Sequence, residues 1–173
     1  MIKKITLFMS LFIWGYSNND FSKLQLNEKI YQINKYINSF PYKKDEELYG
    51  FRDYKASLKE FIHNNGGDCE DYAIAKYELY IQNGLNPKDF IMIYGTYKNQ
   101  AHMVLGYKNE LLNKNWIILD NLRVRPMNFD TIIKDFKPIY SYNPKSNDLY
   151  SYNIKTKSFD KLKEKYIFRK ILY

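Results

Sequence analysis

The chain has 173 residues, a length that suits one domain with a single hydrophobic core. Its net charge of +8 comes from scattered lysines with no stripe of arginines between aromatics, so a solvated lysine-rich surface is the simpler interpretation and no nucleic acid is expected as a partner. The single cysteine excludes an internal disulfide, and with only two histidines beside it a zinc site is not expected.

The first residues have the pattern of a secretory signal peptide. Lys3 and Lys4 precede an apolar run over residues 5–14, which is short for a membrane span, and small residues follow. We therefore expect a signal peptide over residues 1–17 and a mature domain over residues 18–173. An uncleaved N-terminal anchor is the alternative. A lone free thiol in an exported protein calls for a function, and catalysis is one.

The first half of the chain predicts helices. Isoleucines recur at helical spacing over residues 24–40, before a proline, and residues 42–55 are interpreted as a loop. A capping-box pattern predicts a short helix over residues 57–62. After the break at residues 64–67, Asp68 is a good N-cap for a helix that ends at an Asn-Gly pair.

The second half predicts a sheet, because runs rich in Ile, Tyr and Phe alternate with short turns that favour antiparallel pairing. The expected strands are residues 90–97, 101–107, 116–120, 139–142 and 149–154. A short helix is expected over residues 129–136, and the tail from Ser158 has a weak helical pattern. Helices followed by strands predict an α+β fold, with N-terminal helices packed on an antiparallel sheet.

Cys69, His102 and Asp120 form a candidate catalytic triad. A cysteine nucleophile acts as the thiolate, and both a helix N-terminus and a nearby imidazole favour that anion. His102 lies near the start of one predicted strand and Asp120 at the end of the next, so antiparallel pairing can bring them together above the helix start that carries Cys69. Gly66 and Gly67 would let a substrate backbone approach closely.

Three blocks resemble the signature motifs of the bacterial transglutaminase-like cysteine proteinases, the LapG-type family. They are GDCEDYAIAKY at residues 67–77, AHMVL at residues 101–105 and LDN at residues 119–121. Similarity extends to residues 38–42, 45–53 and 138–143. Lys55 departs from the family pattern, which has a tryptophan there, and this concerns the substrate cleft more than the triad.

The resemblance implies a papain-like or transglutaminase-like core with the nucleophile at a helix N-terminus. It makes Cys69 the nucleophile, His102 the general base and acid, and Asp120 the carboxylate that orients the imidazole, with a thioester intermediate. The backbone N–H of Cys69 is expected to donate to the oxyanion. No second oxyanion donor is evident from the sequence.

Members of the family also bind calcium beside the nucleophile, and the matching residues are Asp68, Glu70 and Asp71. Three carboxylates within four residues suit a hard cation with oxygen ligands. Asn121 and backbone carbonyls are candidates to complete the coordination shell. The alternative is that these acidic residues only cap the helix and complement its dipole.

The resemblance further implies a periplasmic endopeptidase that cleaves the N-terminal region of a large RTX-type surface adhesin at a paired-alanine site, and so controls adhesin release and biofilm. An inner-membrane cyclic-di-GMP receptor that sequesters the protease is the second expected partner. Two alternatives stay open: a transglutaminase or amidase that uses the same triad, because only the acyl acceptor differs, and a non-catalytic binding module of the same fold.

Overall fold

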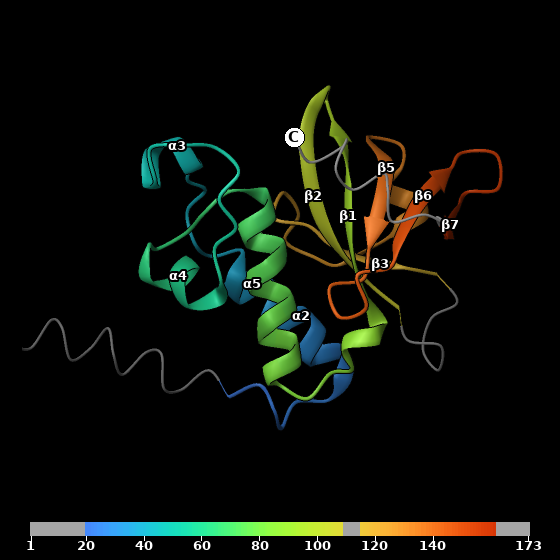
Figure 1. Cartoon of the computed structure of the whole chain (residues 1–173). Helices are drawn as coiled ribbons and strands as arrows, with labels where there is room; N and C mark the ends of the chain where they lie inside the picture. Colours follow the sequence, from blue (N-terminus) through green and yellow to red (C-terminus); the bar gives the residue numbers. More distant parts are fainter. Residues whose placement is uncertain (1–19, 109–114, 162–173) are drawn as a thin grey trace, which may run out of the picture.

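The computed structural model describes residues 20–108 and 115–161, and the expected signal peptide over residues 1–17 lies outside them. The helices are α2 (Leu26–Ile37), α3 (Asp45–Leu48), α4 (Leu58–His63), α5 (Cys69–Gln82) and α6 (Phe129–Ile132), with a 3-10 turn, η1, at Pro87–Asp89. The strands are β1 (Phe90–Tyr97), β2 (Gln100–Tyr107), β3 (Ile117–Leu119), β4 (Met127–Asn128), β5 (Phe136–Tyr142), β6 (Leu149–Asn153) and β7 (Ser158–Lys161). Helices α2 to α5 lie to one side of the strands (Figure 1).

Local signals set the helix boundaries. The amide of Ser57 donates to the Glu60 carboxylate at 2.8 Å, and the amide of Glu60 donates back to the Ser57 hydroxyl at 3.4 Å, which completes the predicted capping box of α4. Helix α5 begins directly after Asp68, as predicted, and ends before Asn83. The predicted loop over residues 42–55 was incomplete, because it contains the one-turn helix α3.

The described strands form one antiparallel sheet with the order β4-β3-β2-β1-β5-β6-β7, so the predicted α+β class is confirmed. Strands β1 and β2 pair along their whole length, with Gly95 opposite His102. Strand β3 is much shorter, and its pairing with β2 ends where Leu105 faces Leu119. Asp120 therefore lies just beyond the ladder, close to the unpaired part of β2.

One prediction for the second half was wrong. The predicted helix over residues 129–136 is only one turn, because Phe136 is buried and begins strand β5. The tail from Ser158, whose pattern is ambiguous, begins with strand β7, where Phe159 packs against Tyr152 with ring centroids 5.2 Å apart; the rest of the tail lies outside the described residues. The two-residue strand β4 had no signal of its own, since it forms only by pairing with β3. Tertiary contacts overrode weak local preference in each case.

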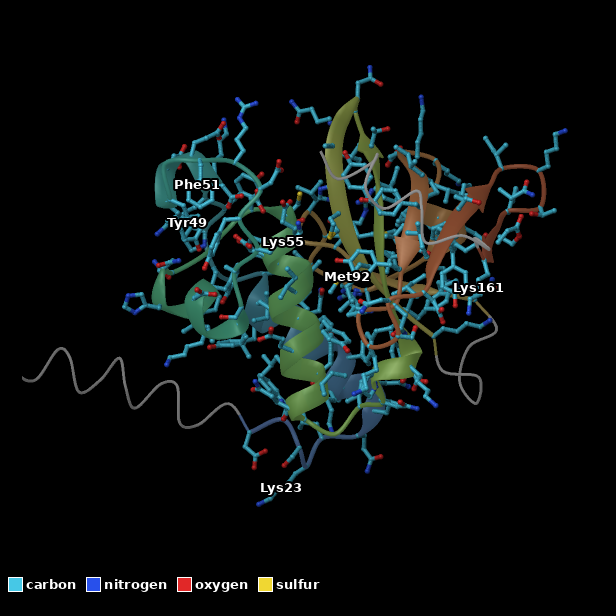
Figure 2. The ribbon with its side chains drawn as sticks, in the orientation of Figure 1. Lys23, Tyr49, Phe51, Lys55, Met92 and Lys161 are labelled. Atoms are coloured by element: carbon cyan, nitrogen blue, oxygen red, sulfur yellow. The ribbon has the colours of Figure 1, made fainter. Side chains whose placement is uncertain are left out.

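The apolar side chains form two clusters, one on each face of the sheet, in place of the single core expected. Met92, Met103 and Leu105 face helices α2, α4 and α5, and Figure 2 shows Met92 on β1 in the middle of the molecule. Ile93 and Val104 face the opposite side and pack with α6 and β5. Within the described residues, no helix has both the length and the apolar character needed to cross a membrane.

Candidate active site

Cys69 lies at the first position of helix α5, and two glycines shape the chain before it. Gly66 has a φ of +123°, and a Cβ there would overlap the Pro41 carbonyl oxygen. A Cβ on Gly67 would collide with the Asp71 carboxylate. The missing side chains of these glycines therefore leave space for Pro41 and Asp71 of the same chain. The expectation was that they would leave space for a substrate backbone.

Gly66→Ala is expected to destabilise the fold by at least about 2 kcal/mol, because it adds a steric clash to an unfavourable φ. Gly84→Ala is the matched control, since Gly84 has a φ of +86° and a Cβ added there would meet nothing within 4 Å. Urea unfolding of both variants measures the difference. Equal losses in the two variants would show that crowding by Pro41 has no energetic weight.

His102 and Asp120 meet across strands β2 and β3. The Nε2 atom of His102 lies 2.9 Å from Oδ1 of Asp120, and the two side chains are 7% and 1% exposed. This contact is the one that antiparallel pairing predicts. The His102 ring also contacts Phe136 and Tyr97, with centroids 6.1 Å away in both cases. Because Nε2 is engaged with Asp120, Nδ1 is the ring nitrogen left for proton exchange.

Asp120 has two further partners in the loop that follows it. Its Oδ1 accepts the amide of Leu122 at 3.0 Å, and its Oδ2 accepts from the guanidinium of Arg123. Burial alone would raise the pKa of Asp120, but the hydrogen bond and charge of His102, the Leu122 amide and Arg123 together lower it below its ordinary value. Asp120 therefore stays ionised and fixes the orientation of the imidazole.

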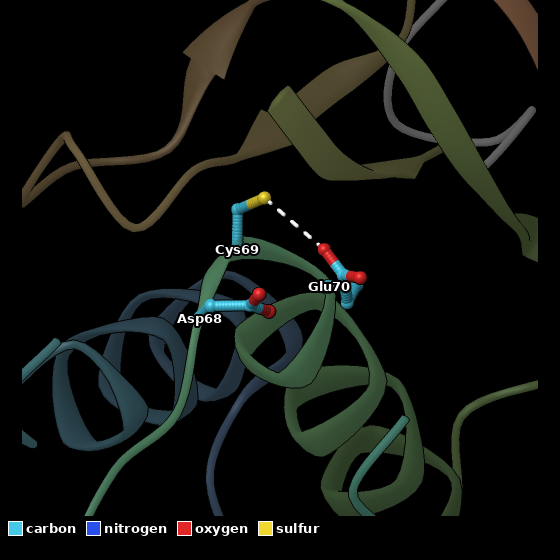
Figure 3. A group of neighbouring side chains, drawn as sticks. All are labelled: Asp68, Cys69 and Glu70. Atoms are coloured by element: carbon cyan, nitrogen blue, oxygen red, sulfur yellow. Dashed lines mark hydrogen bonds between the residues drawn. The ribbon is translucent and has the colours of Figure 1, made fainter. Parts of the chain in front are cut away.

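The sulfur of Cys69 lies among acidic groups. The sulfur is 3.4 Å from Oε2 of Glu70, and the dashed line in Figure 3 marks this contact. Asp68, the residue before Cys69, adds a second carboxylate. Burial raises the pKa of the Cys69 thiol well above its usual range, the charges of Glu70 and Asp68 raise it further, and the backbone amide of Met103 opposes them. These effects oppose the lowered thiol pKa that a cysteine nucleophile needs.

Helix α5, which begins with Cys69, packs against strand β2, which carries His102. Cys69 packs against the apolar cluster that includes Met103, the residue that follows His102. Among the described residues no hydrogen bond joins the sulfur of Cys69 to His102. The catalytic roles of the three residues stay predictions, supported by the packing of α5 on β2 and by the contact between His102 and Asp120.

A cluster of carboxylates surrounds the start of α5, and it includes one residue that the sequence did not point to. Carboxylate oxygens of Asp45, Asp68 and Asp71 lie within 4.8 Å of one another, and Asp68 and Glu70 form a second such group with Cys69. Asp45 comes from helix α3. It reaches the site because the backbone of Lys43 donates to the Gly67 carbonyl at 2.9 Å.

The oxygens of this cluster differ in their partners. Asp71 accepts the amide of Ala56 at 2.7 Å with one oxygen and that of Asp68 at 3.3 Å with the other, so it also holds the loop in place. The Oδ1 atoms of Asp45 and Asp68 are buried and have no hydrogen-bond partner within the described part of the chain. The Oδ1 of Asn121, the further predicted ligand, is unpartnered in the same sense.

Burial and the mutual repulsion of the carboxylates raise the pKa values of Asp68 and Asp71. Burial, followed by the charges of Glu70, Asp45 and Asp71, raises the pKa of Asp68 to about 8. Burial also raises the pKa of Asp71 to about 6, although two backbone amides oppose it. Buried carboxylates with unused lone pairs are the ligands that Ca²⁺ prefers. The residues present therefore fit a calcium ion at this place.

Comparison with known proteins identifies the family. Residues 17–136 match the family model described as bacterial transglutaminase-like cysteine proteinase. The chain belongs to this family. The predicted family is therefore confirmed, and the chain is a transglutaminase-like cysteine protease. A search of curated proteins found no match.

Solved structures of another bacterial transglutaminase-like cysteine proteinase are similar to the chain. LapG from Legionella pneumophila is 31% identical with a TM-score of 0.67, over 80% of this chain and 74% of that one. Its calcium-bound form is 29% identical with a TM-score of 0.70, over 92% and 87%. Its EGTA-treated form is 29% identical with a TM-score of 0.69, over 87% and 80%. The expected transglutaminase-like fold is thereby confirmed.

Lys55, the departure from the family pattern, is exposed and lies near this site. It precedes Ala56, whose amide donates to Asp71 in the first turn of α5, and Figure 2 labels it. The aromatic side chains of Tyr49, Phe51 and Tyr54 cluster in the same segment, with the rings of Tyr49 and Tyr54 4.1 Å apart. This segment therefore presents an exposed lysine next to a cluster of aromatic rings.

Proposed function

We propose that the protein is a periplasmic endopeptidase in which Cys69 is the nucleophile, His102 the general base and acid, and Asp120 the orienting carboxylate. The observation that carries the proposal is the 2.9 Å contact between His102 and Asp120, which forms on a strand that packs against the helix bearing Cys69. Membership of a cysteine proteinase family supports the choice of peptide hydrolysis.

The chemistry follows from these positions. His102 takes the thiol proton on Nδ1, while Nε2–H donates to Asp120 and stabilises the imidazolium. The thiolate attacks the substrate carbonyl carbon, and the backbone N–H of Cys69 donates to the oxyanion. His102 then protonates the departing amine, which leaves a thioester on Cys69. Water, deprotonated by His102, attacks the thioester and releases the acid and the free thiol.

The substrate that we propose is the N-terminal region of a large RTX-type surface adhesin, cut at a paired-alanine site to control adhesin release and biofilm. The likeness to LapG structures supports this choice. The test is incubation of the adhesin fragment encoded near this gene with the purified enzyme, followed by mass spectrometry. Two shorter products whose masses sum to substrate plus one water would support hydrolysis. Incorporation of an added amine would instead identify a transferase.

We also propose that an inner-membrane cyclic-di-GMP receptor sequesters the protease. Export to the periplasm, which this partner requires, is supported by the N-terminal sequence pattern. Cell fractionation tests the location. Binding of the purified protease to the receptor's periplasmic domain, measured in the presence and absence of the cyclic dinucleotide, tests the partner. A protease confined to the cytoplasm would contradict both.

We propose calcium as the cofactor, held by Asp68, Glu70 and Asp71 with Asp45 as a further ligand. The unpartnered oxygens of Asp45 and Asp68 support this set. A bound divalent cation would offset the negative charge that raises the pKa of the Cys69 thiol. Asp71 would combine this role with its backbone contacts.

Asp45→Asn is expected to weaken calcium binding roughly tenfold or more, because it removes one charged ligand from the site. Calorimetry with calcium chloride measures the affinity directly. Glu47→Gln is the matched control, since it removes the same charge from an exposed position of the same helix. Equal calcium affinity in Asp45→Asn and Glu47→Gln would show that Asp45 is not a ligand.

Calcium is also expected to raise the melting temperature of the wild type more at pH 8 than at pH 5.5, because protons compete for the carboxylates.

A further inference from the structure

Lys76 is a fully buried cation that the chemistry above does not use. It lies on helix α5 two turns after Cys69 and is 0% exposed. Its Nζ donates to the carbonyl oxygen of Leu119 at 3.2 Å and lies 5.9 Å from the centre of the Tyr72 ring. Burial lowers the pKa of Lys76 to about 7, and the charge of Asp120 opposes that shift. Burying an ammonium costs stability, so its presence calls for a function.

The acceptor of Lys76 lies next to the proposed catalytic carboxylate. Strand β3 pairs with β2 only as far as Leu119, so Asp120 has no ladder partner to fix its backbone. Side chains from the helical layer instead donate hydrogen bonds to the backbone carbonyls of Leu119 and Asp120. Lys76 from α5 holds the Leu119 carbonyl, and Asn38, which follows α2, donates to the Asp120 carbonyl at 2.8 Å.

We propose that Lys76 is a positioning residue that fixes the Leu119–Asp120 peptide against the helix carrying Cys69. The inference rests on the proposed function, because this spacing matters only if Cys69, His102 and Asp120 act together. One side chain thereby links the element that bears the nucleophile to the element that bears the carboxylate. A displacement of about 1 Å in such a constellation can reduce the rate about a hundredfold.

A positioning role and a purely structural role predict different behaviour for Lys76→Met. Methionine fills similar space without a charge, so the variant avoids the cost of burying an ammonium. For a positioning residue, the melting temperature stays the same or rises, while kcat for the adhesin fragment falls about tenfold and KM is unchanged. For a structural residue, the melting temperature falls and activity falls only with the folded fraction.

The deciding measurement is the state of the His102 ring. The chain has two histidines, so His63→Gln, at an exposed site, leaves His102 as the sole histidine in every protein compared. Ring ¹⁵N chemical shifts then report its tautomer. We expect one tautomer, with hydrogen on Nε2, in the parent and in the control Lys59→Met, which alters an exposed lysine of α4. We expect mixed tautomers in Lys76→Met, because Asp120 is no longer held toward the ring.

An unchanged His102 tautomer in Lys76→Met would overturn the proposal, and so would a marked fall in melting temperature or a failure to fold. The ring shifts and the melting temperature do not depend on a substrate. If the parent protein cleaves no adhesin fragment, the proposed function fails, while these two measurements still decide whether Lys76 positions Asp120.

Discussion

Cys69→Ala is expected to lower the rate of peptide cleavage by about 10⁵-fold or more, because no other group can form the thioester. Cys69 is the single cysteine of the chain, so no second thiol can replace it. The side chain is only partly buried, and its loss should leave the fold intact. Cleavage of the adhesin fragment, followed over time by gel and mass spectrometry, gives the rate.

The same cysteine provides an independent check. Because there is one thiol, iodoacetamide can add at one position only, and intact mass gives the extent of labelling. Wild-type activity should disappear in proportion to the labelled fraction. His63→Ala is the control, since His63 ends helix α4 on the surface and should retain full activity. Cleavage that continues in Cys69→Ala, with a purity that excludes contaminating protease, would end the proposed mechanism.

Asp120→Asn is expected to reduce kcat/KM by about 10³- to 10⁴-fold with little change in KM. Asparagine keeps the shape but not the charge, so it stabilises the imidazolium less and can donate to the ring, which favours the wrong tautomer. The variant also leaves Arg123 without its buried ionic partner. Initial rates over a range of substrate concentrations separate kcat from KM.

Asp135→Asn is the matched control for this experiment. Asp135 is the other carboxylate that pairs with Arg123, at 3.5 Å, but it is 62% exposed and does not contact His102. We expect less than a twofold change in activity, since exposed ion pairs contribute little. If Asp120→Asn retained activity within fivefold of the wild type, Asp120 would not be the orienting carboxylate.

The helical half of the fold was predictable because its signals are local. Ser57 with Glu60 and the sequence from Asp68 onward mark helix starts through contacts within one turn of the chain. The long strands β1 and β2 were also predictable, since each has an apolar pattern of its own. Strands β4 and β7 were not, because their stability comes from a partner strand that the sequence does not specify.

The residues of the candidate site also differ in whether the sequence indicates them. Cys69, His102 and Asp120 stand out in the sequence because they lie in the blocks that resemble the family's signature motifs. Asp45 did not, because nothing in its own helix α3 indicates that the chain folds back beside Gly67. A short acidic helix usually indicates a solvated surface. Asp45 is recognised as a candidate ligand because its Oδ1 is buried and has no hydrogen-bond partner among the described residues.

By itself the sequence determined the family, the helix that begins at Cys69 and the three residues proposed for catalysis, since these depend on local order and recognisable motifs. The tertiary structure alone decided that Asp45 joins the acidic cluster, that Pro41 crowds Gly66 and that Lys76 reaches the Leu119 carbonyl. Each of these contacts joins residues far apart in the chain. A short stretch of sequence specifies neither which distant residues come into contact nor how deeply they are buried.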